Sequence, residues 1–211
     1  MNDFLFMGPA IQALSKGRVF QQIFALILRV VGVLTFLFLA YTWIRMWGLV
    51  FHLGGFFAVV GGIIFQGIFV IGAYMVLHAI FIRAGTLAAL PQGDFVVIPI
   101  MSVLLRLMGE IYASVLAVVA VGGCILAWFA GDRAMYLLSM VSGGMPLPTG
   151  SGFIGGLMVL IIGICAAFAS LVIFYFLAEL LVIFADIALN SRVTSKVAEQ
   201  YAKQPLEGTS A

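Results

Sequence analysis

Residues 152–178 read GFIGGLMVLIIGICAAFASLVIFYFLA, a run without a single charged side chain. About 20 apolar residues in a helix suffice to cross the hydrocarbon core of a bilayer, so this run is long enough to span it. Over the whole chain, 64% of the 211 residues are hydrophobic and 9% are charged. Soluble domains carry about 25% charged residues. The chain is therefore expected to fold in a membrane.

Three further apolar segments precede this run. We predict membrane spans at roughly 20–47, 53–82, 97–130 and 152–189. The short alternating strands of a β-barrel are not seen in the sequence. The fold class that follows is an all-α integral membrane protein with four transmembrane helices, arranged as two helical hairpins. Because the fourth segment would form a helix longer than the bilayer is thick, we expect its end to project into the cytoplasm and to cover an apolar face there.

The two hairpins show signs of duplication. Residues 28–32 (LRVVG) recur as residues 105–109 (LRLMG). Two glycine-rich blocks with a following tyrosine also match, Gly62 with Gly163 and Tyr74 with Tyr175. Chance alignment of apolar, glycine-rich segments is the alternative, and we favour duplication. The predicted divisions are an N-terminal segment 1–19, a first hairpin 20–90, a second hairpin 91–190 and a C-terminal tail 191–211.

Lysine and arginine placement predicts the orientation. The basic residues on one side are Lys16, Arg18, Arg29, Arg83, Arg106, Arg192, Lys196 and Lys203. Only Arg45 and Arg133 fall on the other side. Positive residues favour the cytoplasmic side, so both termini are predicted to be cytoplasmic and the two hairpins to be parallel repeats. In general character the chain resembles small bacterial membrane proteins, which favours a multi-pass protein of the bacterial inner (cytoplasmic) membrane.

Ionisable residues near the cytoplasmic boundary are the main candidates for a functional site. The predicted cluster comprises Arg29, His78, Arg83, Arg106, Glu110, Glu179 and Asp186. Within it, Arg106 and Glu110 are four residues apart on one helix and can pair. One interpretation is an entry site for protons or ions, or a docking site for a partner subunit. The other, which we favour, is a set of ion pairs that fixes helix register, because charges at several depths would be needed to conduct.

Small residues recur at helical spacing on the second and fourth segments. The candidate packing residues are Gly54, Gly62, Gly152, Gly156 and Gly163. Small residues allow membrane helices to approach closely. They could form a surface for self-association or pack within one bundle, and we favour packing within the bundle.

Known catalytic and cofactor patterns are not found in the sequence. It has no G-x-S-x-G, H-E-x-x-H, phosphate-binding G-x-x-x-x-G-K or C-x-x-C motif. His52 and His78 lie about 39 Å apart along one helix and could not share a haem. We therefore predict no catalytic residue, cofactor or metal, and the small net charge of +2 gives no sign of nucleic-acid binding. Gln66, at mid-depth, fits an interhelical hydrogen bond as well as a ligand.

The predicted function is that of a non-enzymatic subunit or scaffold of a larger inner-membrane assembly. Its partners would be the lipid bilayer and other membrane subunits, or further copies of the chain. Charged residues 192–203 favour a short helix that could contact a partner. The alternative is a small oligomeric channel or transporter that uses Glu110 and Glu179 within the membrane.

Overall fold

The computed structural model describes residues 18–52, 54–90, 97–131 and 152–203. This part of the chain is all helical, with α2 at Arg18–His52, α3 at Phe56–Ala88, α4 at Val97–Ala130 and α6 at Gly152–Lys203. All four helices are long and apolar enough to cross a membrane, which confirms the prediction of an all-α chain with four membrane-spanning helices. The pairing of the helices as two parallel repeats and the orientation of the termini stay predictions. The predictions for the N-terminal segment and for the tail from Gln204 lie outside the described residues, apart from Arg18 and Val19.

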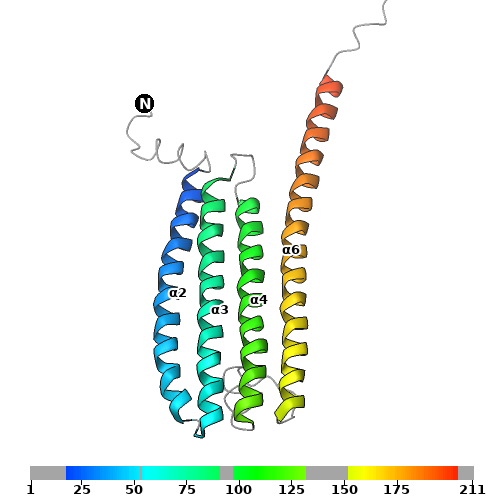
Figure 1. Cartoon of the computed structure of the whole chain (residues 1–211). Helices are drawn as coiled ribbons and strands as arrows, with labels where there is room; N and C mark the ends of the chain where they lie inside the picture. Colours follow the sequence, from blue (N-terminus) through cyan, green and yellow to red (C-terminus); the bar gives the residue numbers. More distant parts are fainter. Residues whose placement is uncertain (1–17, 53, 91–96, 132–151, 204–211) are drawn as a thin grey trace, which may run out of the picture.

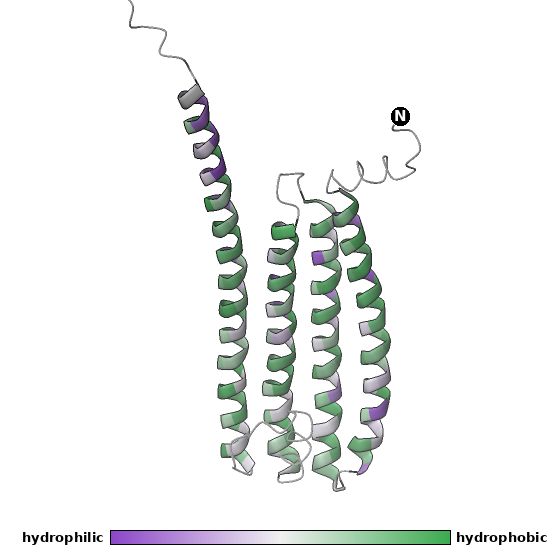
Figure 2. Ribbon diagram, turned by 180° about the vertical axis from the view of Figure 1, so that it is seen from behind, coloured by the Kyte–Doolittle hydropathy of each residue, from purple (hydrophilic) through white to green (hydrophobic). Residues whose placement is uncertain are grey.

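The helices form a bundle in which each one packs mainly on its neighbours in the chain. The principal contacts are α2 with α3, α3 with α4 and α4 with α6, and Figure 1 shows them side by side in that order. Both inner helices therefore have protein on two sides, whereas α2 and α6 form the edges. Figure 2 shows hydrophobic residues along the length of all four helices, as lipid contact requires.

Two glycine-containing turns set helix ends. Gly54 and Gly55, with φ of +68° and +91°, form the sharp connection between α2 and α3. Gly131, with φ of +57°, ends α4 while its N–H donates to the carbonyl of Ala127 at 3.1 Å. Glycine adopts these left-handed conformations without the steric cost that a Cβ would bring. The hydrophobic pattern places the spans, and these glycines place two of their ends.

Helix α3 ends later than the sequence suggested. We predicted a span to about residue 82, whereas α3 continues through Ala88. Arg83 therefore lies on a helix and not in a loop. Its extra turns are held by packing, because Ala84 and Leu87 are completely or almost completely buried. At the start of α4, Pro99 occupies the first helical turn, where its missing N–H costs little.

The main hydrophobic core lies at the end of the bundle where α3 ends and α4 begins, which we call the Arg83 end. Its buried residues come from α2, α3 and α4, and the core consists of Ala25, Leu28, Val76, Ile80, Ala84, Leu87, Ile100, Val103 and Leu107. Helix α6 contributes none of them. Small residues instead allow α6 to approach α4 closely, since Gly163 faces Ala120 and Gly109 faces the Cβ of Phe174. The edge helix α6 is therefore held differently from the other three.

Helix α6 is much longer than its neighbours. Its 52 residues correspond to about 78 Å, against a hydrocarbon core of about 30 Å. Figures 1 and 2 show its C-terminal part extending beyond the ends of the other helices, and Figure 2 shows this part as the most hydrophilic of the bundle. The predicted helix over 192–203 is thus the direct continuation of the fourth span. Beyond Leu189, the described residues of this chain provide no apolar face for the helix to cover, because residues 190–201 are all exposed.

Candidate functional site

A polar cluster ties three helices together within the bundle. Arg83 of α3 forms a salt bridge with Glu110 of α4, and its Nε donates a second hydrogen bond to Glu110 Oε2 at 3.1 Å. The two side chains are only 17% and 22% exposed. A paired guanidinium and carboxylate in this two-bond geometry satisfy each other where water is scarce. The pair therefore fixes the register of α3 against α4.

Helix α6 joins this pair through Tyr175. The Tyr175 hydroxyl donates to Glu110 Oε1 at 2.7 Å and accepts from Arg83 Nη2 at 3.0 Å. We call Arg83, Glu110 and Tyr175 the three-helix cluster. Each of its members comes from a different helix and bonds both others. Such a closed arrangement leaves Glu110 with its charge compensated and both carboxylate oxygens engaged.

Arg106 occupies a different position from the one expected. The spacing of four residues suggested a pair with Glu110, but the salt bridge of Glu110 is with Arg83. An arginine from the facing helix can offer a two-bond fork to the carboxylate, which is stronger than a pair along one helix. The Arg106 guanidinium instead lies over the Tyr175 ring, 5.7 Å from its centroid. Its Nε is buried and makes no hydrogen bond within the described part of the chain.

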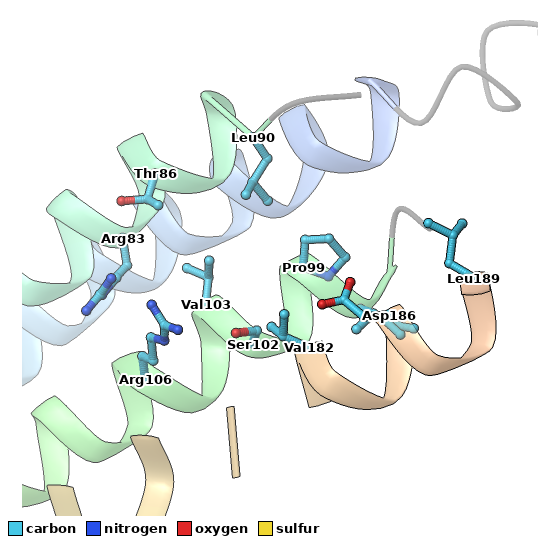
Figure 3. A pocket seen from close by; sticks show the side chains of 12 residues that line it. Arg83, Thr86, Leu90, Pro99, Ser102, Val103, Arg106, Val182, Asp186 and Leu189 are labelled. Atoms are coloured by element: carbon cyan, nitrogen blue, oxygen red, sulfur yellow. The ribbon is translucent and has the colours of Figure 1, made fainter. Parts of the chain in front are cut away.

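A groove opens beside the cluster at the Arg83 end. It has a volume of about 680 Å³ and is lined by α3, α4 and α6. Figure 3 shows its polar residues, with Arg83 and Arg106 at one end and Asp186 of α6 toward the other. Ser102 of α4 and Thr86 of α3 also line it, and the remaining walls are mostly apolar. We refer to this space as the α6 groove.

The predicted charged cluster is thus assembled in part. Arg83, Glu110, Arg106 and Asp186 lie in or beside the α6 groove. The remaining three predicted members, Arg29 of α2, His78 of α3 and Glu179 of α6, are exposed and do not line the groove. His78 stacks on the Tyr74 ring, with centroids 5.5 Å apart. Because α2 is an edge helix, Arg29 cannot converge with the others as the prediction supposed.

The candidate packing glycines fall into two groups. A Cβ at Gly62 would come within 2.6 Å of Val50 on α2, and one at Gly156 within 2.9 Å of the Cys124 carbonyl on α4. Gly163 lies against Ala120, so these three sit at contacts inside the bundle. Gly54 and Gly152 have positive φ values of +68° and +76° at helix boundaries. Their role there is conformational.

Sequence reasoning overlooked Tyr175 as a site residue. It appeared only as the repeat match of Tyr74, although a tyrosine hydroxyl inside an apolar span needs a partner. The need for a partner, together with the position of Tyr175 four residues before Glu179, could have identified it as a member of the polar cluster. Ser102, 5% exposed, and Thr86 were also overlooked, because isolated small hydroxyl residues are common in membrane helices.

Gln66 of α3 is a further buried polar residue. It is 2% exposed and donates from Nε2 to the Trp43 carbonyl of α2 at 3.4 Å. Of the two possibilities raised by the sequence, the structure shows the interhelical hydrogen bond.

The fold and the site define a multi-pass, all-helical membrane protein in which an arginine–glutamate–tyrosine cluster joins α3, α4 and α6. In the described residues, no group of three or more His, Cys, Asp or Glu side chains could hold a metal ion. Comparisons with family models, curated proteins and solved structures found no match to this chain. Its function therefore has to be inferred from its own geometry.

Proposed function

We propose that this chain is a non-enzymatic subunit or scaffold of a larger assembly in a bacterial inner membrane, and that the projecting end of α6 contacts a partner. The observation that carries this proposal is the continuation of α6 beyond the bundle. Leu189 still lines the α6 groove with Ile98, which lies in the first turn of α4. The following 14 residues to Lys203 extend about 21 Å further.

The projecting segment carries a narrow apolar stripe. Val193, Val197 and Tyr201 are four residues apart, so they share one helix face. Their side chains are exposed by 55%, 42% and 73%. A short isolated helix is only marginally stable in water and gains most of its stability from packing an amphipathic face. A protein partner on this stripe would supply that packing.

The three-helix cluster supports a structural role for the charges. A channel or transporter that uses Glu110 would need this carboxylate to exchange its partner during transport. Here Glu110 is engaged by Arg83 and Tyr175 together. Glu179, the second residue of the alternative hypothesis, is exposed on α6 and does not line the α6 groove. The geometry therefore favours the subunit or scaffold over the small oligomeric channel.

The orientation proposed from the sequence fits this function. With Arg29, Arg83 and Arg106 toward the cytoplasm, the projecting end of α6 also lies on the cytoplasmic side. It would there meet a cytoplasmic domain or the cytoplasmic part of another membrane subunit. Arg192 and Lys196 would add favourable contacts to an acidic partner surface.

Site-specific photocrosslinking in the source membrane tests the proposal. A photoreactive amino acid at Val197 should give a discrete adduct with another polypeptide. The same residue at Phe168, which is 69% exposed on the membrane-spanning part of α6, is the matched control and should give mainly lipid adducts. Native mass spectrometry of the gently extracted protein should then show a complex that contains this polypeptide.

The same experiments can also contradict the proposal. Only lipid adducts from Val197, together with a native mass of this chain alone or of its homo-oligomer, would contradict the subunit hypothesis. An ion or solute flux in liposomes that falls in the Glu110→Gln and Glu179→Gln variants would support the channel instead.

A further inference from the structure

The α6 groove contains two charges of opposite sign that have no ion-pair partner among the described residues. Arg83 is neutralised by Glu110, but Arg106 forms no salt bridge in the described ranges and has a buried, unpartnered Nε. Asp186 likewise forms no salt bridge there, although it lines the groove from α6. A groove with one cation and one anion that both lack an ion-pair partner among the described residues is complementary to a zwitterion.

The two charges lie at different levels of the groove. Figure 3 shows Arg106 at one end, Asp186 beside Pro99 toward the other end, and Ser102 and Val182 between them. Arg106 and Pro99 are seven residues apart on α4, or about 10 Å along the helix axis. The ligand must therefore present its anionic group deeper in the bundle and its cationic group nearer the helix ends.

The surroundings of these charges favour a lipid. The walls carry apolar side chains from three helices, including Leu90, Val103 and Val182. The groove sits at the Arg83 end, where α3 ends and α4 begins, and Figures 1 and 2 show α6 leaning away from α4 toward this end. Helix ends mark the headgroup region of a bilayer, and a groove open between α4 and α6 can admit acyl chains from the side.

We propose that the α6 groove binds a phospholipid with a phosphoethanolamine headgroup. Arg106 binds the phosphate with its guanidinium, and Ser102 can donate a further hydrogen bond to it. The Asp186 carboxylate accepts hydrogen bonds from the primary ammonium, while the apolar walls hold the chains. This site goes beyond the scaffold role proposed above, because it uses the embedded part of α6 and not its projecting end.

The two charges also predict selectivity among headgroups. An anionic headgroup without an amine would satisfy Arg106 but would place its charge near Asp186 without a cation between them. A choline headgroup carries the cation but has no N–H to donate to the carboxylate. The ethanolamine headgroup alone among these three satisfies both ends of the groove.

Native mass spectrometry of the full-length protein tests this site. Delipidated protein would be offered equal amounts of phosphatidylethanolamine, phosphatidylcholine and phosphatidylglycerol with identical acyl chains. The wild type should retain the ethanolamine lipid about tenfold over the others, the effect of one additional charged hydrogen bond. Asp186→Asn should bring this preference close to parity, whereas Glu179→Gln, an exposed carboxylate on the same helix outside the groove, should keep it.

Arg106 has its own matched control. Arg106→Gln should lower retention of all three lipids together, whereas Arg29→Gln, at the corresponding position of the first hairpin, should not. Helical circular dichroism and elution volume would verify the fold of each variant. Because Asp186 is exposed, its variant decides the question even where Arg106→Gln fails to fold. Equal retention of the three lipids, preference for phosphatidylglycerol, or an unchanged preference in Asp186→Asn would overturn the proposal.

Discussion

The two hairpins place similar residues in opposite environments. In the first, Tyr74 is 64% exposed and stacks on the exposed His78, while Arg29 also lies on the surface. In the second, the matching Tyr175 bonds Glu110 and Arg83, and its ring lies under the matching Arg106. For the two arginines, the difference follows from position in the bundle, whereas Tyr74 lies on the inner helix α3 and Tyr175 on the edge helix α6. Helix α4 has a helix on both sides, whereas α2 has one main neighbour.

This contrast shows how a membrane protein can keep a residue pattern and change its use. At an edge helix, an arginine near the boundary can extend its charge toward water. Between two helices the same residue type is partly enclosed by protein, and Arg106 there lies over the Tyr175 ring while its Nε has no hydrogen-bond partner among the described residues. Glu110 has no counterpart in the first hairpin, where Val33 occupies the matching position. The acidic residue of the second hairpin pairs with Arg83, a guanidinium that the first hairpin contributes.

The largest expected effect comes from breaking the central ion pair. Glu110→Gln leaves Arg83 without a counter-charge at a site where its side chain is only 17% exposed. We expect a loss of about 2–4 kcal/mol in the free energy of unfolding, somewhat less than for a fully buried pair. Reversible unfolding in mixed detergent micelles would measure it. The exposed Glu179→Gln is the control and should change stability by less than about 0.5 kcal/mol.

A double-mutant cycle sharpens this prediction. Combining Glu110→Gln with Arg83→Gln should cost less than the sum of the two single substitutions, because the second removes the stranded charge left by the first. Equal small effects of Glu110→Gln and Glu179→Gln would show that the two carboxylates lie in equivalent environments. The contrast between the interior and the edge would then fail.

The next effect concerns close helix packing in the second hairpin. Gly163→Ala places a Cβ against both the side chain and the backbone of Ala120, so α6 must move away from α4. Overpacking of this kind costs about 1–3 kcal/mol. Gly67→Ala on α3 is the control, since a Cβ there meets nothing within 4 Å, and it should cause no loss. The same unfolding assay applies, and equal stability of the two variants would contradict close contact between α4 and α6.

The sequence was sufficient to predict the four spans, because the mostly apolar segments 20–47, 53–82, 97–130 and 152–189 are each longer than the about 20 residues that a bilayer requires. It also located Arg83, Arg106, Glu110 and Asp186 as residues that need an explanation within the membrane. It could not pair them, since pairing depends on which helix faces which. The local rule of four residues suggested Arg106 for Glu110, and the tertiary contact between α3 and α4 supplied Arg83 instead.

Two other differences between the prediction and the structure also arise from tertiary packing. Arg83, Gly85 and Thr86 interrupt the apolar run after residue 82, but burial of Ala84 and Leu87 keeps the helix intact through Ala88. The charged residues were predicted to form one cluster because they all fall near the cytoplasmic boundary, and packing in chain order leaves Arg29 on α2 away from the site. Local patterns identify helices well, whereas neighbour relations between helices require the structure.

The smallest effect tests the comparison most directly, because it applies one substitution to both hairpins. Tyr175→Phe removes the hydroxyl that donates to Glu110 at 2.7 Å and retains the ring beneath Arg106. We expect a loss of about 1 kcal/mol, since a hydrogen bond to a charged group is removed while Arg83 still pairs with Glu110. Tyr74→Phe, at the corresponding position on α3, should change stability by no more than about 0.3 kcal/mol because its exposed ring keeps its stacking on His78. Similar losses in both variants would mean that the tyrosine hydroxyl contributes equally to stability in both hairpins. The hydrogen bonds of the three-helix cluster would then not distinguish the second hairpin from the first.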